Sequence, residues 1–288
     1  VNILQSLGVA MEPLLPALQH RLAVLRRRRG FNVEKWVEAK VELLNSYARK
    51  TGLHAVVVGV SGGIDSALVL SLAMRASQVP GSPIKRVVGV CLPYLKLKAG
   101  TTNQSDATAR GKAVIASTGA ELMVVDLTDT HKMLSATIDK ETGVKSNAWA
   151  SGQLVSYLRT PALYYATALL SQSGTPAIVL GTTNRDEGAY IGYFGKAADG
   201  MNDVQLISDL HKSEVYLASR FLANIPEEIM TAIPTGDVYD GRTDEQLIGV
   251  PYDAIELHAL MKTIAAPSEA DLPLPTVQEQ TQWDKFFD

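Results

Sequence analysis

The sequence predicts an α/β fold with a doubly wound, mostly parallel sheet and helices on both of its faces. Short apolar runs, several of them rich in valine, occur at residues 55–60, 85–92, 121–127 and 175–180. Such runs are typical of strands that are buried on both faces. Segments with helical spacing separate them, and this alternation of strands and helices favours a parallel sheet in one Rossmann-like domain over residues 1–288.

Two helices are expected before the first strand, within an N-terminal part that covers residues 1–52. Residues 12–29 carry leucines at helical spacing and end in the run Arg26–Arg29, after which Gly30 would stop the helix. Asn32 is a suitable N-cap for the second helix. The arginine run is compatible with a nucleic-acid patch, a targeting remnant or a solvated helix end. We interpret it as a solvated end, because cations stabilise helix C-termini.

The later elements continue the alternation. Helices are expected after the first strand and over residues 103–117, 129–141 and 149–171, the last with a kink at Pro161. Beyond residue 205 the pattern is mostly helical with loops. Residues 265–288 form an expected C-terminal tail that begins with prolines and acids. Its end is expected to dock on the fold through Trp283, Phe286 and Phe287.

Composition limits the classes of function. The chain has 288 residues, a formal net charge of −3, 46% hydrophobic residues and one cysteine, Cys91. This charge gives no general attraction to nucleic acid or to a membrane surface. One cysteine excludes an intrachain disulfide and a cysteine-based metal site, and it favours a reducing compartment. No apolar run approaches the ~18 residues of a membrane span and no signal-peptide pattern occurs, so we expect a cytoplasmic protein.

The first strand leads into the segment Ser61-Gly-Gly-Ile-Asp-Ser66, and a helical pattern follows. Glycines allow a tight turn and the close approach of an anion, and a helix start adds free N–H donors and a positive dipole end. The segment therefore predicts a site for phosphate or pyrophosphate. Asp65 stands where a Walker A loop carries a cation, which implies magnesium between Asp65 and a polyphosphate. The alternative is an ordinary strand–helix turn.

A second polar cluster follows the strand at residues 175–180. It reads Gly181-Thr-Thr-Asn-Arg-Asp-Glu187, and it places Thr182 and Glu187 at the same sheet edge as Asp65. Two carboxylates from neighbouring strand ends, together with phosphate oxygens, suit a magnesium ion. Acids in the first turn of a helix are the alternative explanation, and the spacing by itself leaves both open.

Both clusters resemble known motifs. The loop Ser61–Ser66 resembles the pyrophosphatase loop of the ATP-pyrophosphatase superfamily, and the block from Gly181 to Asp203 is similar to the second block of the NAD synthetases. Shorter blocks that end in Lys212 and begin at Ile233 and Thr243 resemble that family as well. Four ordered blocks thus span residues 55–260.

The resemblance implies roles for individual residues. ATP would contact a set of loop and strand-end residues that comprises Gly59, Val60, Ser61, Gly62, Gly63, Ile64, Asp65, Ser66, Thr182, Lys212 and Thr235. Asp65 and Glu187 would bind magnesium, and Asp65 and Lys212 would be catalytic. Deamido-NAD would contact Lys196 and Asp203, and also Trp149, Tyr157 and Arg159 on the helix at 149–171. Asp244, Glu245, Tyr252 and Asp253 would be mainly architectural.

The chain departs from the family pattern at several places. The position that usually holds an arginine on the acceptor helix is Tyr157, with Arg159 as the candidate substitute. The loop at residues 93–102 is longer than usual, Cys91 replaces an arginine, and Glu187 and Lys196 lie one residue further apart. These departures concern recognition of the acceptor more than binding of ATP.

The activity implied by the resemblance is that of an ammonia-dependent NAD synthetase. The nicotinate carboxylate of deamido-NAD attacks the α-phosphate of ATP, pyrophosphate leaves, and ammonia then displaces AMP. Glutamine use is not expected, because about 50 residues before the first strand are too few for a glutaminase domain. Alternatives are a GMP-synthetase-like amidotransferase subunit, an RNA-thiolating enzyme, and a non-catalytic nucleotide-binding module.

A homodimer is also expected, with the acceptor site at its interface. The family resemblance suggests it, and the helix at residues 149–171 is apolar on nearly all sides. Such a helix must be buried on more than one side. A second copy of the helix would cover one face and would bring Trp149 to a shared cleft. Cover by the N-terminal helices or the tail of the same chain is the alternative.

Overall fold

The computed structural model describes residues 12–94, 104–236, 242–264 and 276–287. The helices are α1 (Pro16–Arg29), α2 (Val33–Thr51), α3 (Ile64–Gln78), α4 (Gln104–Thr118), α5 (Thr128–Thr142), α6 (Ala148–Gln172), the π-helix η2 (Arg185–Ile191), α7 (Lys212–Leu222), α8 (Glu227–Met230), α9 (Asp244–Ile248), α10 (Tyr252–Thr263) and α11 (Val277–Phe287). The strands are β1 (Ala55–Gly59), β2 (Arg86–Cys91), β3 (Glu121–Val124), β4 (Ala177–Gly181) and β5 (Val204–Gln205).

The five strands form one parallel sheet in the order β3-β2-β1-β4-β5. After β1 the chain builds outward through β2 and β3, and it then returns to the other side of β1 to add β4 and β5. The direction of winding therefore reverses between β1 and β4. In such sheets ligands bind at the carboxyl ends of the strands on either side of this reversal. The predicted doubly wound parallel sheet is confirmed.

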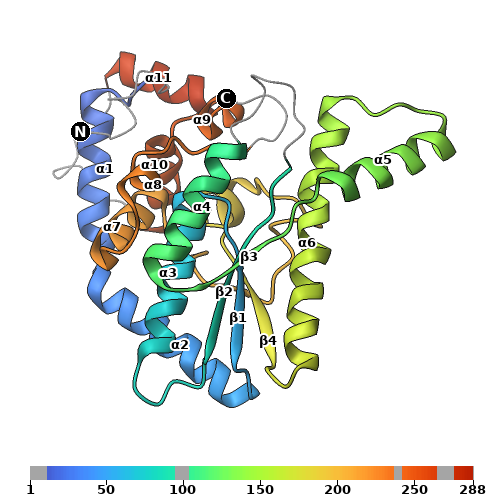
Figure 1. Ribbon diagram of the computed structural model, residues 1–288. Helices are drawn as coiled ribbons and strands as arrows, with labels where there is room; N and C mark the ends of the chain where they lie inside the picture. Colours follow the sequence, from blue (N-terminus) through green and yellow to red (C-terminus); the bar gives the residue numbers. More distant parts are fainter. Residues whose placement is uncertain (1–11, 95–103, 237–241, 265–275, 288) are drawn as a thin grey trace.

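Helices cover both faces of the sheet, and β1 faces a core on each side. Val56 and Val58 pack in the core beneath α2, α3 and α7, whereas Ala55 and Val57 pack in the core beneath α6. All four side chains are at most 1% exposed. Figure 1 shows α3 and α6 on opposite sides of the strands. Burial on both faces explains why β1 is a continuous apolar run.

A third core joins the two ends of the chain. Leucines of α1 pack against α10 and against Trp283, Phe286 and Phe287 of α11, so the end of the chain docks as predicted. Glu279 and Gln282 of α11 accept hydrogen bonds from the backbone N–H groups of Ala17 (3.1 Å) and Leu15 (2.8 Å). These bonds satisfy donors that the start of α1 leaves without an intrahelical partner. Figure 1 places α1 and α11 side by side.

Several sequence-based expectations need correction. The arginine run ends α1 at Gly30 as predicted, but it is not simply solvated. Arg26 pairs with Asp253 (2.8 Å) and Glu256 (2.5 Å), and Arg29 pairs with Glu214. The patterns also missed β5, and they extended β3 to residue 127 although it ends at residue 124. Helix α6 continues through Pro161, and the kink expected there stays a prediction. Residues 95–102 of the long loop and 265–275 of the tail lie outside the described residues.

Candidate active site

The loop between β1 and α3 forms a tight turn that is held by its own side chains. Gly62 has φ +83°, which is a left-handed conformation that favours glycine, and Gly63 is the N-cap of α3. The Ser66 hydroxyl accepts the N–H of Ser61 (3.2 Å) and donates to the carbonyl of Gly63 (3.0 Å). The Ser61 and Ser66 hydroxyls are 3.1 Å apart. Ser66 therefore shapes the loop, and the exposed Ser61 lies at its surface.

Helix α4 supports this loop from outside. The Arg110 side chain donates to the carbonyl of Gly62 (3.1 Å), and a Cβ atom on Gly62 would overlap the carbonyl oxygen of Ala107. Gly59 approaches α6 closely as well, since a Cβ there would lie 3.2 Å from a methyl group of Leu163. Packing thus requires glycine at position 62 in addition to the turn, whereas a side chain at position 59 would need Leu163 to shift.

The catalytic candidates Asp65, Glu187 and Lys212 meet beside the loop. The ammonium of Lys212 donates to Asp65 (2.7 Å) and to Glu187 (2.9 Å), and its side chain is only 5% exposed. Asp65 comes from the first turn of α3, Glu187 from the first turn of η2, and Lys212 is the first residue of α7. Asp65 and Lys212, which are 147 positions apart, are joined in this way. The ends of neighbouring strands predicted that Asp65 and Glu187 lie at one edge, whereas Lys212 was expected there only from the family resemblance.

Three further residues complete the cluster. Asn184 donates to Asp65 (2.9 Å) and accepts the N–H of Glu187 (3.0 Å). The Tyr252 hydroxyl lies 2.6 Å from Glu187 and 3.1 Å from Asp244. Tyr252 and Asp244, which were expected to be mainly architectural, therefore contact the site as well. The only available signal was their acidic and phenolic chemistry within a block that matches the family.

Burial and charge shift the pKa values of this cluster in different directions. Burial raises the pKa of Asp65, and the nearby Lys212 only partly offsets this. Burial also acts to raise the pKa of Glu187, but the Lys212 ammonium and the Tyr252 hydroxyl outweigh it and lower that pKa. Burial opposes the charge on Lys212, yet Asp65, Glu187 and Asp244 raise its pKa well above the ordinary value. Lys212 is therefore a fixed cation at neutral pH.

The segment after β4 adopts a π-helix that the sequence patterns did not predict. The Asn184 side chain caps it, and Gly192 ends it with φ +76°. π-helical turns are rare and frequently occur at functional sites. This turn buries Asp186 completely, and it leaves Glu187 partly exposed beside Lys212. Both acids lie in the first turn of η2, but their side chains make different contacts. Asp186 accepts the backbone N–H of Lys212, whereas Glu187 accepts a hydrogen bond from the Lys212 ammonium.

The donors in the cluster are compatible with magnesium. Among the described residues, no group of three or more His, Cys, Asp or Glu side chains is arranged to hold a metal. Asp65 and Glu187 supply two carboxylates that contact the same ammonium group. Magnesium is commonly held by one or two carboxylates together with substrate phosphates and water. The pair fits such an ion, provided that the Lys212 ammonium moves from between the two carboxylates.

The acceptor candidates lie on α6 and in the segment after η2. Trp149 is 58% exposed and Tyr157 is 42% exposed. Burial lowers the pKa of Arg159, and the neighbouring Asp199 opposes this shift. The Thr160 hydroxyl donates to the carbonyl of Ala197 (2.8 Å) and so holds this segment, including the exposed Lys196, against α6.

The other predicted site residues, Asp203, Thr182 and Thr235, lie in three different environments. The Asp203 carboxylate accepts the N–H of Val179 (2.7 Å) and the hydroxyl of Tyr164 (3.2 Å), so it joins β4 to α6. Thr182 is half-buried directly after β4, and Thr235 is exposed. No described contact links the acceptor candidates Trp149, Tyr157 and Lys196 to the cluster around Lys212.

The parallel sheet, the glycine-rich loop and the cluster at the reversal point define a nucleotide-binding α/β enzyme. The NAD synthase family model matches residues 36–283. An NH(3)-dependent NAD(+) synthetase of Methanococcoides burtonii is 31% identical over 216 residues, which cover 75% of this chain and 74% of the relative. One of Pyrococcus furiosus is 30% identical over 229 residues, covering 79% and 78%. The chain belongs to the NAD synthase family.

Solved structures agree on the fold. The NMN synthetase from Francisella tularensis has a TM-score of 0.68 at 24% identity, covering 89% of this chain and 96% of that one. The NAD+ synthetase from Burkholderia pseudomallei has a TM-score of 0.64 at 23% identity, covering 96% of each chain. The predicted family, the α/β fold and the ATP-using ligase class are therefore confirmed. Within the described part of the chain, no helix combines the length and apolarity needed to cross a membrane.

Proposed function

We propose that this chain makes NAD from deamido-NAD with ATP and ammonia, through an adenylated intermediate. The observation that carries this function is the contact of the Lys212 ammonium with Asp65 and Glu187 at the reversal point of the sheet. A cation and two carboxylates beside a glycine-rich helix start suit a magnesium-bound polyphosphate. The names of the curated relatives support the same reaction.

The loop would hold the phosphates of ATP. Backbone N–H groups of Gly63, Ile64 and Asp65 lie at the start of α3, where an anion is stabilised by free donors and by the helix dipole. Ile64 is 3% exposed, so only its backbone can serve the ligand. Asp65 and Glu187 would hold magnesium, which supplies charge neutralisation for the phosphates. Thr182 and Thr235 remain proposed ATP contacts.

Catalysis by this chain would consist of positioning and charge stabilisation. Lys212 keeps its charge at neutral pH, so it can neutralise negative charge that develops on the phosphates. No covalent nucleophile is required. Cys91 is 1% exposed, and burial raises the pKa of its thiol, which makes it unsuitable as a nucleophile for releasing ammonia from glutamine. Free ammonia is therefore the proposed nitrogen donor.

The acceptor would bind between two copies of the chain. Exposed apolar side chains of α5 and α6 include Met133, Ile138, Trp149, Tyr165 and Leu169. Helices α1, α2 and α11 pack against α10, α3 and α7, so they leave this surface free for a partner. We infer a homodimer in which Trp149 stacks on the nicotinate ring, with Tyr157, Arg159, Lys196 and Asp203 as the remaining proposed acceptor contacts.

The proposed function is tested by supplying ATP, magnesium and ammonium with different acceptors. Deamido-NAD should give NAD, AMP and pyrophosphate in equal amounts, whereas XMP and transfer RNA should give none. Nicotinate mononucleotide belongs among the acceptors, because one structural neighbour is an NMN synthetase. Preferred turnover of any other acceptor would refute the assignment to deamido-NAD. Glutamine should not replace ammonium when contaminating glutaminase is absent.

Substitution of Asp65 tests the proposed magnesium site. Asp65→Asn should abolish pyrophosphate release and leave the melting temperature within a few degrees of wild type, because an amide can still accept the hydrogen bond from Asn184. Magnesium titration should show the loss of an ATP-dependent site. Turnover near the wild-type rate at ordinary magnesium concentrations would remove Asp65 from the metal site.

The dimer is tested by light scattering and by Trp149→Ala. The wild type should be a dimer at micromolar concentration. The substitution should raise the KM for deamido-NAD by about fivefold, because stacking on an aromatic ring contributes about 1 kcal/mol, and it should leave the KM for ATP nearly unchanged. A fully active monomer would contradict the proposed interface.

A further inference from the structure

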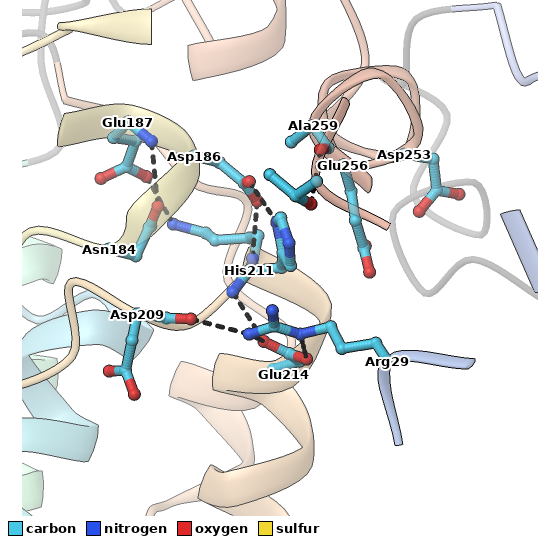
Figure 2. A network of polar contacts seen from close by, with 12 residues as sticks. Arg29, Asn184, Asp186, Glu187, Asp209, His211, Glu214, Asp253, Glu256 and Ala259 are labelled. Atoms are coloured by element: carbon cyan, nitrogen blue, oxygen red, sulfur yellow. Dashed lines mark hydrogen bonds and ion pairs between the residues drawn. The ribbon is translucent and has the colours of Figure 1, made fainter. Parts of the chain in front are cut away.

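Two completely buried residues sit directly before the residues that form the catalytic cluster. Asp186 precedes Glu187, His211 precedes Lys212, and both Asp186 and His211 are 0% exposed. Their side chains meet at 2.6 Å between the Asp186 Oδ1 and His211 Nδ1 atoms. Figure 2 shows this pair between Glu214 on one side and Asn184 with Glu187 on the other.

Each oxygen of Asp186 has a separate donor. Oδ1 contacts the His211 ring, and Oδ2 accepts the backbone N–H of Lys212 at 2.8 Å. A third bond, from the N–H of Arg185 to the carbonyl of Leu210 at 2.8 Å, joins the same two segments. The start of η2 is therefore tied to the start of α7 at the positions adjacent to Glu187 and Lys212.

We propose that Asp186 and His211 are positioning residues that fix the Lys212 ammonium relative to Glu187. This inference rests on the proposed function of Lys212 and Glu187 in binding the phosphates of ATP. The pair touches neither substrate nor metal. It sets the relative position of the two backbone segments that carry the charged groups.

The surroundings of Lys212 explain why such a pair is needed. Lys212 is the first residue of α7, where the helix dipole disfavours a cation. The Glu214 side chain already satisfies the N–H of His211 (2.9 Å), and Arg29 holds Glu214 in turn. That contact caps the helix but does not reach η2. The bonds from Asp186 tie this helix start to the segment that carries Glu187, and the bond from Arg185 to the carbonyl of Leu210 supports them.

The buried His211 ring also has one unfavourable feature. Its Nε2 atom is buried and has no hydrogen-bond partner among the described residues. Because Asp186 offers a carboxylate oxygen, the proton of the ring lies on Nδ1 and the unpartnered Nε2 is an acceptor. A buried polar atom without a partner is unfavourable. Histidine accepts this disadvantage because its Nδ1 donor satisfies Asp186, and the Nδ1 donor is therefore the feature that the site requires.

The test compares two substitutions of His211. His211→Leu removes the donor and leaves Asp186 Oδ1 buried without a partner, whereas His211→Asn keeps an N–H donor near the position of Nδ1. We expect His211→Leu to lower kcat by 10- to 100-fold with the KM values for ATP and deamido-NAD within about threefold of wild type, since supporting contacts and small displacements have effects of this size. His211→Asn should stay within about threefold of the wild-type kcat.

Asp186→Asn gives an independent measurement. The amide can accept from only one of the two donors and turns its NH₂ group toward the other, so kcat should fall as in His211→Leu. Because both substitutions break the same connection, the double variant should be no slower than the slower single variant. If His211→Leu does not fold, Asp186→Asn and His211→Asn still decide the question.

Two control variants separate positioning from general destabilisation. Ser219→Ala changes a buried hydroxyl of α7 that has no hydrogen bond within the described residues. Asn45→Ala removes a buried amide that bonds the carbonyl of Ala76 and the hydroxyl of Ser82, at the opposite end of α3 from Asp65. Both should keep the wild-type kcat at 25 °C, even where the melting temperature falls as far as in His211→Leu.

The outcomes distinguish this inference from the proposed function. A wild type that forms no NAD refutes the proposed function. A wild type that forms NAD, with His211→Leu and Asp186→Asn at wild-type kcat, refutes the positioning role alone. A loss of kcat in His211→Asn equal to that in His211→Leu, or an equal loss in Asn45→Ala, also refutes it.

Discussion

Lys212→Met is the substitution for which the structure makes the most detailed prediction. The Lys212 ammonium contacts Asp65 at 2.7 Å and Glu187 at 2.9 Å, and the charge of Asp244 lies close enough to raise its pKa further. Methionine fills a similar volume but carries no charge. The variant therefore retains the packing and leaves three partly buried carboxyl groups without their cation.

The expected loss of stability is large. Removing one partner of a buried ion pair costs about 3–5 kcal/mol, because the remaining charge is left uncompensated. A domain of this size loses about 2–4 °C in melting temperature for each kcal/mol. We therefore expect Lys212→Met to melt about 10 °C below the wild type at pH 8, with NAD formation abolished.

The pH dependence of this loss provides a stricter test. In the wild type the pKa of Lys212 is raised, so its contribution is complete below its unfolded pKa of about 10.4 and is lost only at still higher pH. In the variant, burial and mutual repulsion raise the pKa of Asp65 further. A carboxyl group with a raised folded pKa weakens stability as pH rises. The difference in melting temperature should therefore grow from pH 5 to pH 8.

A second substitution in the same background should restore stability. Asp65→Asn removes one of the repelling charges and still accepts the hydrogen bond from Asn184, so the double variant should recover about half of the lost stability. Calorimetry across pH 5–8 measures both effects. Two results would contradict this account of the charges on Lys212, Asp65 and Glu187. One is a difference in melting temperature between Lys212→Met and the wild type that does not change with pH, and the other is further destabilisation of Lys212→Met by Asp65→Asn.

Two other predictions concern the loop and the arginine run. Gly62→Ala should lower stability by about 2–4 kcal/mol and weaken ATP binding, because its left-handed φ and the nearby Ala107 carbonyl both exclude a Cβ; unchanged ATP affinity by calorimetry would contradict this. Arg29→Met should cost about 3 kcal/mol, since it leaves the buried Glu214 unpaired. Arg27→Met is its matched control, and this exposed residue should cost less than about 0.5 kcal/mol in denaturant unfolding.

The features that could be predicted from sequence are those that are local. An apolar run predicts a buried strand, and glycines directly before a helical pattern predict a phosphate loop. These patterns correctly located β1 and the loop at residues 61–66. The meeting of Asp65 with Glu187 followed from parallel strands that end at one edge. The N-cap at Asn32 and the stop at Gly30 were also correct.

The features that could not be predicted depend on contacts between distant segments. Tyr252 reaches Glu187 across 65 residues, and Arg29 reaches Glu214 across 185. No spacing rule in a single sequence encodes such pairs. The π-helix is equally invisible, because its residues carry no repeating apolar pattern and its geometry depends on the caps at Asn184 and Gly192. The short β5 exists only as the partner of β4.

The residues of the cluster share one structural position, the start of a helix, and no single motif shows this. Asp65, Glu187, Lys212, Asp244 and Tyr252 each come from the first turn of a different helical segment, namely α3, η2, α7, α9 and α10. Their side chains nevertheless form one continuous series of contacts, which runs from Asp65 through Lys212, Glu187 and Tyr252 to Asp244.

This arrangement explains how carboxylates and phosphates can share one site. The longer helices α3, α7 and α10 direct the positive ends of their dipoles toward the cluster, which favours anions there. The helix dipoles stabilise the negative charges of Asp65 and Glu187 and destabilise the positive charge of Lys212. The ion pairs with Asp65 and Glu187 must therefore hold the Lys212 ammonium in place. In the proposed function, the helix starts would stabilise the phosphates of ATP, and Asp65 and Glu187 would hold magnesium. The Lys212 side chain would then contact the phosphates from a backbone position that Asp186 and His211 fix.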